Sequence, residues 1–431
     1  MTETLHEGIR KMNKPDIRFN GFNGEWEEKN YKEVFDTSVS NNTFSRAELT
    51  SEKTSTKNVH YGDILIKYNS ILSVKKDDFP FIPDYVKVDS KNFLKNGDIV
   101  FADTAEDETC GKAIEITDLE NENVMAGLHT FVARPKLQFQ EKYLGYFINS
   151  PAYHNQLIPY MQGTKVTSIS KTNVQKTSVK YPNATEQTKI GNLFSQIDSL
   201  ISSTQKEHDK LVSLKKCMLQ KMFPKKGCLV PEIRFEGFSG DWEEKKISDL
   251  ATIFIGLVTT MTKYYSNQGT LLIRNSDIKD NYFSFSDNPI YLNQEFADQN
   301  SSRKHKIGDV ITVHTGDVGT SAVITEKEDG TIGFATIVTR PKTNLLDSIF
   351  LSIFLNSDAH KIWAVSVSTG DGRTNYNLGD YTQLLLKIPS LPEQQKIGSY
   401  FQNLDNLIFK QSAELEKLKN VKKTLLSKMF V

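Results

Sequence analysis

The chain has 431 residues, of which 38% are hydrophobic and 25% charged, so it can form packed cores and does not have the composition of a disordered chain. At about 150 residues per domain, this length indicates about three domains, or two domains with a sizeable connector. The 53 Lys and Arg residues balance 53 Asp and Glu residues. This balance excludes a strongly basic protein that binds nucleic acid over its whole surface, but it leaves room for a local basic patch.

The cysteine and hydropathy patterns indicate the compartment. Cys110, Cys217 and Cys228 are scattered and odd in number, which argues against a disulfide framework and for a reducing environment. No apolar run approaches the roughly 18 residues that a membrane span needs, and residues 1–14 form a polar leader unlike a signal peptide. We therefore expect a cytoplasmic protein that does not contact a membrane. No Cys or His spacing resembles a zinc site, and we expect no metal and no cofactor.

The first element in chain order is a short block that occurs twice. Residues 15–29 read PDIRFNGFNGEWEEK and residues 231–245 read PEIRFEGFSGDWEEK, with 11 of 15 positions identical. Such a match indicates an internal duplication. Trp26 and Trp242 are candidate anchors for docking a partner, because Trp is enriched at interface hot spots. The equally open alternative is that both indoles pack on their own scaffold.

The segment after each block predicts mixed α/β structure. Turn-bounded runs rich in β-formers at 63–68, 98–102 and 309–313 predict strands, and 141–149 and 347–357 predict helices. Short echoes link the copies, such as FVARPK at 131–136 and IVTRPK at 337–342. Residues 36–60 and 252–282, in contrast, share almost nothing. We expect the two copies to do different things with these divergent parts.

A polar loop that contains glycine lies at corresponding positions in the two copies, at 163–171 and 370–378. Its Lys or Arg, hydroxyl and amide side chains are types that contact phosphates and base edges. A solvated or protein-contacting turn is an equally open interpretation, and a basic cluster at 303–306 is a weaker candidate. The DNA-contacting candidates are Lys165, Thr167, Ser168, Lys171, Arg373, Thr374, Asn375, Tyr376, Arg303 and Lys304.

Each copy ends in a predicted long helix. Residues 186–223 and 393–430 align without gaps at 18 of 38 identical positions and show a heptad pattern of apolar residues. Each helix would be roughly 57 Å long. Lys215 and Lys422 interrupt the two seams at the same position. We expect the helices to pair antiparallel as a coiled coil, although the pattern alone also allows other self-association. The seam residues are Ile190, Phe194, Ile197, Ile201, Leu211, Ile397, Phe401, Leu404, Ile408 and Leu418.

Sequence patterns for catalysis are absent. The segment from Asn288 to Tyr291 lacks the second proline of an amino-methyltransferase motif, and no glycine-rich cofactor loop accompanies it. The carboxylates Asp84 and Asp89 with Lys91 are too closely spaced for a metal-dependent nuclease, and no phosphate-binding loop of NTPases occurs. We therefore expect a chain that is not an enzyme.

The repeat order resembles that of the DNA specificity subunit of type I restriction–modification systems. The segments 182–191 (PNATEQTKIG) and 389–398 (PSLPEQQKIG) carry the resemblance, as do the repeated leader blocks. One departure is Thr185, where the second copy has Pro392. The resemblance implies two target recognition domains, each reading half of a split site in double-stranded DNA. It also implies a helical spacer, two methyltransferase subunits as partners, and nuclease–translocase subunits that join them.

The expected architecture is mixed α/β (α+β) with two tandem pseudo-symmetric target recognition domains, separated by two long helices that pair as an antiparallel coiled coil. The expected boundaries are a leader at 1–14, a first domain at 15–182, a spacer helix and linker at 183–230, a second domain at 231–389 and a last helix at 390–431. Two alternatives stay open. One is a duplicated coiled-coil adaptor that binds proteins, and the other is a degenerate restriction or modification enzyme.

Overall fold

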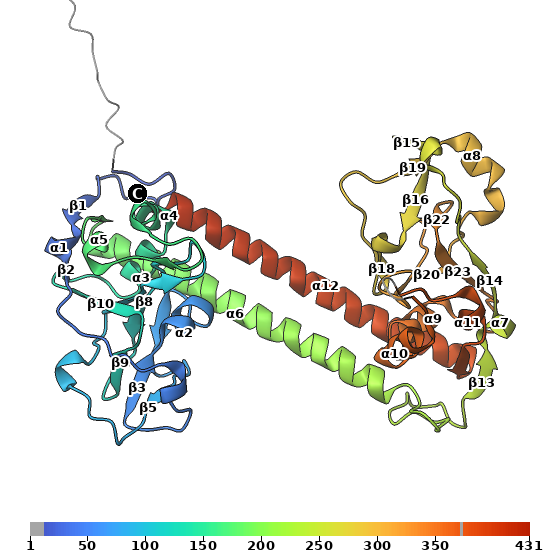
Figure 1. Cartoon of the computed structure of the whole chain (residues 1–431), viewed down its shortest axis with the longest axis horizontal. Helices are drawn as coiled ribbons and strands as arrows, with labels where there is room; N and C mark the ends of the chain where they lie inside the picture. Colours follow the sequence, from blue (N-terminus) through green and yellow to red (C-terminus); the bar gives the residue numbers. More distant parts are fainter. Residues whose placement is uncertain (1–12, 371–373) are drawn as a thin grey trace, which may run out of the picture. The chain divides into compact units, whose positions relative to one another are not determined.

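The computed structural model describes residues 13–370 and 374–431. The chain divides into two compact units, and each unit contains parts of both long helices (Figure 1). Unit 1 is Met1–Lys206 with Ala413–Val431, and unit 2 is Glu207–Ser412. The long helices are α6 (Ala184–Lys221) and α12 (Leu391–Lys428). Each begins two residues before the predicted start, so the prediction of two 38-residue helices is confirmed.

Unit 1 is built on a five-stranded sheet in the order β2-β10-β6-β8-β4, in which only the β4–β8 pair is parallel. A second sheet has the order β5-β3-β9, and β1 pairs with β12. The strands are β1 (Glu27–Asn30), β2 (Phe35–Asp36), β3 (Thr56–Val59), β4 (Ile71–Ser73), β5 (Phe81–Ile82), β6 (Ile99–Ala102), β7 (Thr104–Ala105), β8 (Ala113–Thr117), β9 (Asn123–Ala126), β10 (Thr130–Pro135), β11 (Thr167–Ser168) and β12 (Ser178–Tyr181). The helices are α1 (Tyr31–Val34), α2 (Tyr61–Ile66), α3 (Tyr143–Ile148), α4 (Pro151–His154) and α5 (Lys171–Val174).

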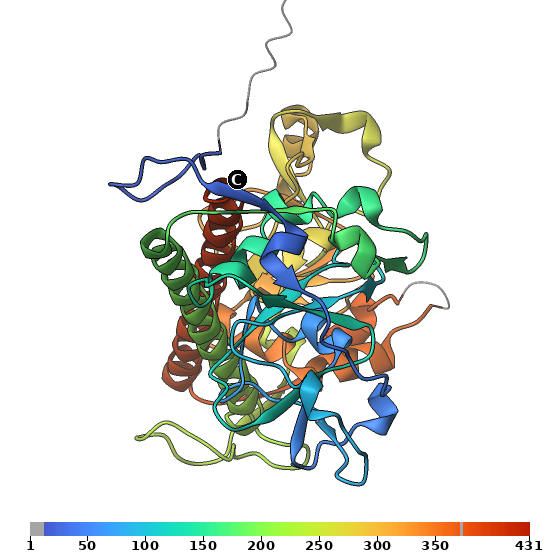
Figure 2. The ribbon, with the colours of Figure 1, turned by 90° about the vertical axis from the view of Figure 1, so that its left-hand side faces the viewer.

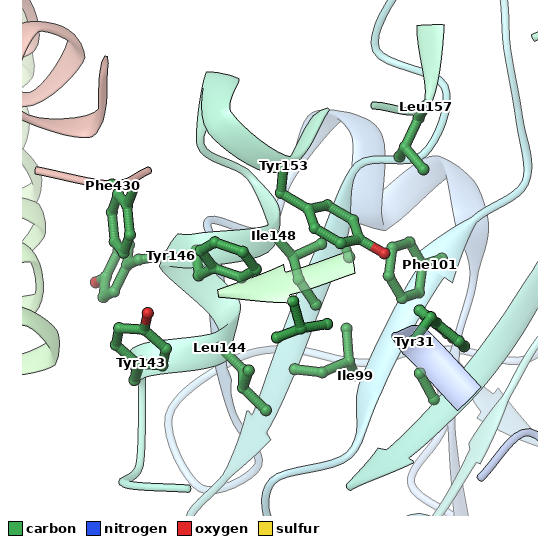
Figure 3. Packing of buried hydrophobic residues seen from close by; sticks show 14 of the residues in the cluster. Tyr31, Ile99, Phe101, Tyr143, Leu144, Tyr146, Ile148, Tyr153, Leu157 and Phe430 are labelled. Atoms are coloured by element: carbon green, nitrogen blue, oxygen red, sulfur yellow. The ribbon is translucent and has the colours of Figure 1, made fainter. Parts of the chain in front are cut away.

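The five-stranded sheet is apolar on both faces. Successive side chains of a strand point to opposite sides, and in the central strand both sets are apolar and buried. In β6, Ile99 and Phe101 pack into one cluster, and Val100 and Ala102 pack into another. The first cluster includes helices α3 and α6 and the end of the chain. Figure 3 shows this packing, with Phe430 next to the helix residues. The C-terminus is therefore part of the core of unit 1.

One predicted strand is wrong. Residues 63–68 were expected to form a strand, but most of them belong to helix α2. The backbone N–H of Gly62 donates to Nδ1 of His60, which caps the helix. The Asp63 carboxylate, in its first turn, is held by Arg46 at 2.6 Å. The alternation of β-forming residues was misleading, since Ile64 is buried while Ile66 is 90% exposed. The strands predicted at 98–102 and 309–313 and the helices at 141–149 and 347–357 are confirmed as β6, β20, α3 and α9.

Unit 2 repeats the central topology of unit 1. Its sheet β14-β23-β20-β21 corresponds to β2-β10-β6-β8, and β16 pairs antiparallel with β19 and parallel with β22, as β3 does with β5 and β9. The strands are β13 (Glu243–Lys246), β14 (Ala251–Ile255), β15 (Tyr265–Ser266), β16 (Thr270–Arg274), β17 (Ile278–Lys279), β18 (Tyr282–Phe283), β19 (Tyr291–Leu292), β20 (Val310–Val313), β21 (Ser321–Val323), β22 (Ile332–Phe334), β23 (Thr336–Pro341) and β24 (Leu385–Ile388). The helices are α7 (Ile247–Leu250), α8 (Gln294–Gln299), α9 (Ser348–Leu355), α10 (Asp358–Val367) and α11 (Leu378–Thr382).

The short sequence echoes correspond to buried polar bonds that both units share. In unit 1 the Arg134 guanidinium makes two bonds to the Asp98 carboxylate, at 2.8 and 2.7 Å. In unit 2 Arg340 and Asp309 make the same pair, with both bonds at 2.7 Å. Each carboxylate is almost fully buried and its guanidinium partly so. Breaking such a pair would leave a buried charge, which gives a physical reason for both copies to have the same pair.

Within each unit the two long helices run antiparallel. In unit 1 the start of α6 lies beside the end of α12, as Figures 1 and 2 both show. Phe194 of α6 stacks on Phe430 at 5.7 Å, and Asp198 pairs with Lys422 at 2.5 Å. In unit 2 the end of α6 packs against the start of α12, where Lys215 bonds Asp405. Pairing as one continuous coiled coil remains a prediction.

Candidate nucleic-acid interface

The glycine-containing loop of unit 1 is attached to the end of the central strand β6. Its strand β11 pairs antiparallel with β7, which follows β6 directly. The backbone N–H of Ile169 also donates to the carbonyl of Asp103 at 2.8 Å. Gly163 has a φ of +117°, and a Cβ there would lie 1.9 Å from the carbonyl oxygen of Val166, so only glycine fits this turn. The loop is therefore held at one rim of the sheet.

The loop of unit 2 occupies the corresponding place after β20. Thr315, two residues beyond β20, forms a backbone bridge with Asn375, and Asn375 also bridges to Thr369. The Thr315 hydroxyl donates to the Asn375 side-chain oxygen at 2.9 Å. The backbone N–H of Tyr376 donates to the carbonyl of His314 at 2.8 Å. The two loops that sequence comparison aligned are therefore attached to equivalent strand ends.

Several side chains at these rims were not singled out from the sequence. In unit 1 exposed His129, in the turn before β10, lies 3.4 Å from the Thr104 hydroxyl and contacts the Tyr61 ring at 5.2 Å between centroids. In unit 2 the backbone N–H of His314 donates to the Asn275 side-chain oxygen at 2.9 Å. The echoes FVARPK and IVTRPK begin two residues after His129 and Ala335. The sequence difference at these positions, directly before the shared motifs, could therefore have indicated the side chains near the loops.

Electrostatically, the two rims differ. His129 lies 3.3 Å from the Asp103 carboxylate, so unit 1 places an imidazole and a carboxylate side by side. Burial lowers the pKa of His314, which favours the neutral form of this imidazole. Around it the described rim of unit 2 contains half-buried hydroxyl and amide groups. Thr315 bonds Asn375, and Asn275 bonds the backbone of His314 and Ala335. Both sets contain donors and acceptors of the kind that read base edges, in different combinations.

The predicted contact residues have different environments. Lys165 and Ser168 are exposed, and Thr167 and Thr374 are half-buried. The Lys171 ammonium donates to the Thr37 carbonyl at 2.7 Å, which ties it to the protein. Arg373 lies outside the described residues. Contact of these residues with DNA stays a prediction.

Three predicted contacts also make bonds within their own unit. Tyr376 is fully buried in the core of unit 2, with its hydroxyl 3.2 Å from the His360 ring, so we leave it out of the proposed surface. Arg303 donates to the carbonyl of Ile255 at 2.7 Å. The Lys304 ammonium pairs with Asp298 at 2.7 Å. These bonds hold both basic side chains against the protein.

The repeated leader blocks are fixed onto the starts of the long helices. Arg18 makes two bonds of 2.7 Å to the Glu186 carboxylate, and Arg234 makes the same two bonds to Glu393. Trp26 is buried against Tyr143 and Phe430.

Trp242 is likewise buried, against Phe223 and Phe350. Both indoles therefore pack on their own unit, and any docking role must act through the surface above them.

The seam residues follow the predicted heptads in their burial. Ile190, Phe194 and Ile197 are buried in unit 1, and Ile397, Phe401 and Leu404 are buried in unit 2. The other predicted seam residues are half-buried, namely Ile201, Leu211, Ile408 and Leu418. This periodicity shows which face of each helix turns inward within its unit.

The described part of the chain contains no group of three or more His, Cys, Asp or Glu side chains that could hold a metal ion. In the same residues, 13–370 and 374–431, no helix combines the length and apolar character needed to cross a membrane.

Comparison with known families identifies the family of this chain. The profile described as "Type I restriction modification DNA specificity domain" matches residues 23–212 and again residues 239–420. The chain belongs to this family. Two specificity domains thus occur in tandem, and each match includes one glycine-containing loop and most of the long helix that follows it.

Curated relatives agree with this assignment. The specificity subunit of the type I restriction enzyme EcoBI from Escherichia coli is 22% identical over 302 residues, which are 65% of this chain and 63% of that subunit. The chain thus matches somewhat less than two thirds of that relative. The putative type I restriction enzyme MjaX specificity subunit from Methanocaldococcus jannaschii is 29% identical over 132 residues, 30% of this chain and 31% of that protein.

Solved structures share the fold. The S subunit of a type I restriction–modification system from M. genitalium matches 97% of this chain and 99% of its own, with a TM-score of 0.60 and 15% identity. A chain from a structure titled for the complex assembly and conformational transition of the type I R-M system matches 94% of this chain and 97% of its own, with a TM-score of 0.51 and 18% identity.

Proposed function

We propose that this chain is the non-catalytic DNA specificity subunit of a type I restriction–modification complex, and that each unit reads one half of an asymmetric, two-part site in double-stranded DNA. One observation carries the proposal. A polar loop is attached to the same strand end in both units, yet the side chains that surround it differ. Two units with the same fold but different side chains around the loop are suited to two different half-sites. A symmetric dimer would instead read a palindrome.

In this proposal the loop residues divide into two roles. Exposed Lys165 neutralises a phosphate, which adds affinity without sequence information. His129 and Thr104 in unit 1, and Thr315 and Asn375 in unit 2, read base edges. The domain boundaries are those expected from the sequence, at 15–182 and 231–389.

The long helices serve as the spacer between the half-sites. Helices α6 and α12 have 38 residues each, so each is roughly 57 Å long, more than one DNA turn of about 34 Å. Inserting four residues near Lys206 should lengthen α6 by about 6 Å and change the spacer but neither half-site.

The repeated leader blocks offer two equivalent docking surfaces for two methyltransferase subunits. Lys189 lies 5.0 Å from the ring of half-exposed Phe22, and Lys396 lies 5.6 Å from the ring of Phe238. Each patch includes an aromatic residue of the block that Trp26 or Trp242 anchors. Nuclease–translocase subunits would join the methyltransferases and supply cleavage, so the chemistry belongs to partners.

Zero net charge predicts weak, salt-sensitive DNA binding by the chain alone. The test is selection from a random duplex library, using the full chain with and without the methyltransferase subunit of the same system. With the partner, retained duplexes should share two fixed sequence blocks separated by a gap of constant length. Failure to enrich any sequence, or enrichment of a palindrome, would contradict the proposal.

A further inference from the structure

Two aspartates on the long helices occupy equivalent positions and hold equivalent lysines. Asp198 of α6 bonds Lys422 of α12 within unit 1, and Asp405 of α12 bonds Lys215 of α6 within unit 2. All four side chains are half-buried, with between 14% and 27% of their surface exposed. Lys215 and Lys422 are the residues that interrupt the apolar seams. The interruptions are therefore paired charges at the helix–helix contact.

Each aspartate also bonds its own α/β domain. The Tyr146 hydroxyl, on α3, donates to Asp198 at 2.9 Å. In unit 2 the Asn281 amide, in the turn between β17 and β18, donates to Asp405 at 3.1 Å. Each carboxylate thus joins three elements, which are its own helix, the opposite helix and the domain. The Asp–Lys pair is the same in both units, whereas the domain-side partner differs.

Asn281 is itself part of a network that reaches the central sheet of unit 2. Its side-chain oxygen accepts bonds from Ser352 and Asn356, both at 2.9 Å, and the Asn356 amide also donates to the carbonyl of Ser321 on β21. In unit 1 the link is more direct. Tyr146 lies on α3, which packs on the sheet, and the Lys422 ammonium lies 5.8 Å from its ring. Movement of either aspartate would therefore be transmitted to the sheet whose rim carries the loop.

The charge pattern also selects one helix arrangement. In a parallel alignment of the two helix copies, Asp198 would face Asp405 and Lys215 would face Lys422, so like charges would meet in a half-buried seam. A slip by one heptad, about 10 Å, would bring each lysine against apolar seam residues and leave its charge unpaired. Such a slip corresponds to about three base pairs at 3.4 Å per step.

We propose that Asp198 and Asp405 are positioning residues that fix each recognition domain at one place along the helix pair and so restrict the DNA spacer to one length. This inference rests on the proposed function. It predicts that weakening these junctions relaxes spacer selection while both half-sites stay the same, because neither aspartate lies at the rim that carries the loops.

The test is methylated-base mapping in the source cell with the full-length chain and its variants. Asp198→Asn and Asp405→Asn, singly and together, remove the charge but keep the shape. We expect methylation at sites whose spacer is about three base pairs longer or shorter to rise about tenfold, the factor that a modest loss of positioning energy gives. Glu414→Gln, which removes a charge from the exposed face of α12, should leave spacer selection unchanged.

Two further variants separate positioning from general stability. Tyr146→Phe removes only the link between Asp198 and α3, and should relax the spacer with little change in melting temperature. Lys422→Met removes the same ion pair from the opposite helix, and provides the test if an Asn variant fails to accumulate. The charge-swapped pair Asp198→Lys with Lys422→Asp should restore strict selection.

The two possible failures differ in what they show. A single strict spacer in all folded variants would overturn the positioning role while leaving the proposed function intact. A wild-type methylome without any two-part motif would overturn the proposed function and this inference with it. A changed half-site sequence in Asp198→Asn would show that the junction contributes to base reading and would also overturn the inference.

Discussion

The helix that packs on the central sheet is capped differently in the two units. In unit 2 the Asp347 side chain accepts the backbone N–H of Phe350 at 2.8 Å, so α9 carries its own cap. In unit 1 the cap comes from the neighbouring strand. The Glu115 carboxylate on β8 accepts the N–H groups of Lys142 at 2.6 Å and Gly145 at 2.8 Å.

The buried Arg–Asp pairs, in contrast, are the same in both units. Asp98 with Arg134 and Asp309 with Arg340 tie the central strands together in the same geometry. A cap is a local bond that a single residue can supply from either side, whereas a buried ion pair requires two residues to change at once. This difference indicates which parts of the fold shared by the two units can diverge. Local bonds and rim residues vary between the copies, and paired buried charges do not.

The largest expected effect tests the shared ion pairs. Arg134→Met in unit 1 and Arg340→Met in unit 2 each leave a buried carboxylate without its partner, and should lower the free energy of unfolding by about 3–5 kcal/mol. Hydrogen exchange in peptides of each unit would measure the loss separately. Exposed Lys136→Met serves as the control and should change stability by less than about 1 kcal/mol. If one Arg variant were as stable as the wild type, the Arg–Asp pairs of the two units would not have equivalent roles.

The next effect concerns Glu115, which caps helix α3 from the neighbouring strand β8. Burial raises the pKa of Glu115 to about 7, against the opposing effect of the N–H groups of Gly145 and Lys142. Because the folded pKa lies above the unfolded value, the stability from this group is fully present below about pH 4.5 and is lost as the pH rises through about 7.

Glu115→Gln should therefore remove a pH dependence of about 3 kcal/mol from unit 1 across this range. Unfolding measured by hydrogen exchange between pH 4.5 and 8 would show it. The equivalent residue in unit 2 is Val323, since the backbone N–H groups of Ala113 and Ser321 make matching donations to the side-chain oxygens of Asn149 and Asn356. Unit 2 is therefore the internal control. If Glu115→Gln left the pH profile of unit 1 unchanged, the ionisation of Glu115 would not be the source of the pH dependence.

A smaller effect concerns base reading at the rim of unit 1. His129 and Ala335 hold equivalent positions with similar backbone angles, at φ +54° and +48°. His129→Ala should thus fold normally, because unit 2 already carries Ala in this conformation. We expect a loss of about 1–3 kcal/mol of discrimination at one base pair of a single half-site, measured by competition among duplexes. A change in both half-sites would argue against independent reading.

The smallest expected effect concerns a phosphate contact. Lys165→Ala should weaken DNA binding by the assembled complex uniformly across sequences and reduce the slope of log affinity against log salt by about 1. Titrations at several salt concentrations would measure this slope. If the variant altered sequence preference without altering the slope, Lys165 would belong with the base-reading residues.

The sequence predicted the frame better than the rim, for physical reasons. Heptad spacing and duplicated motifs report burial directly, which is why α6, α12 and the strand β6 were found. The segment 63–68 was mispredicted because its helix depends on a cap from His60 and an ion pair with Arg46, which lie outside the run. Tyr376 was taken for a contact residue because a polar loop does not reveal that its one aromatic ring turns inward.

The most direct test of two-part DNA recognition is genome-wide mapping of methylated bases in the source cell, with and without this gene. The account predicts that deleting the gene abolishes methylation at one asymmetric motif with two fixed blocks and a constant gap. Replacing residues 30–182 with the corresponding segment of another family member should then change one block only. An unchanged methylome upon deletion, in cells that produce the chain and its methyltransferase partner, would contradict the account.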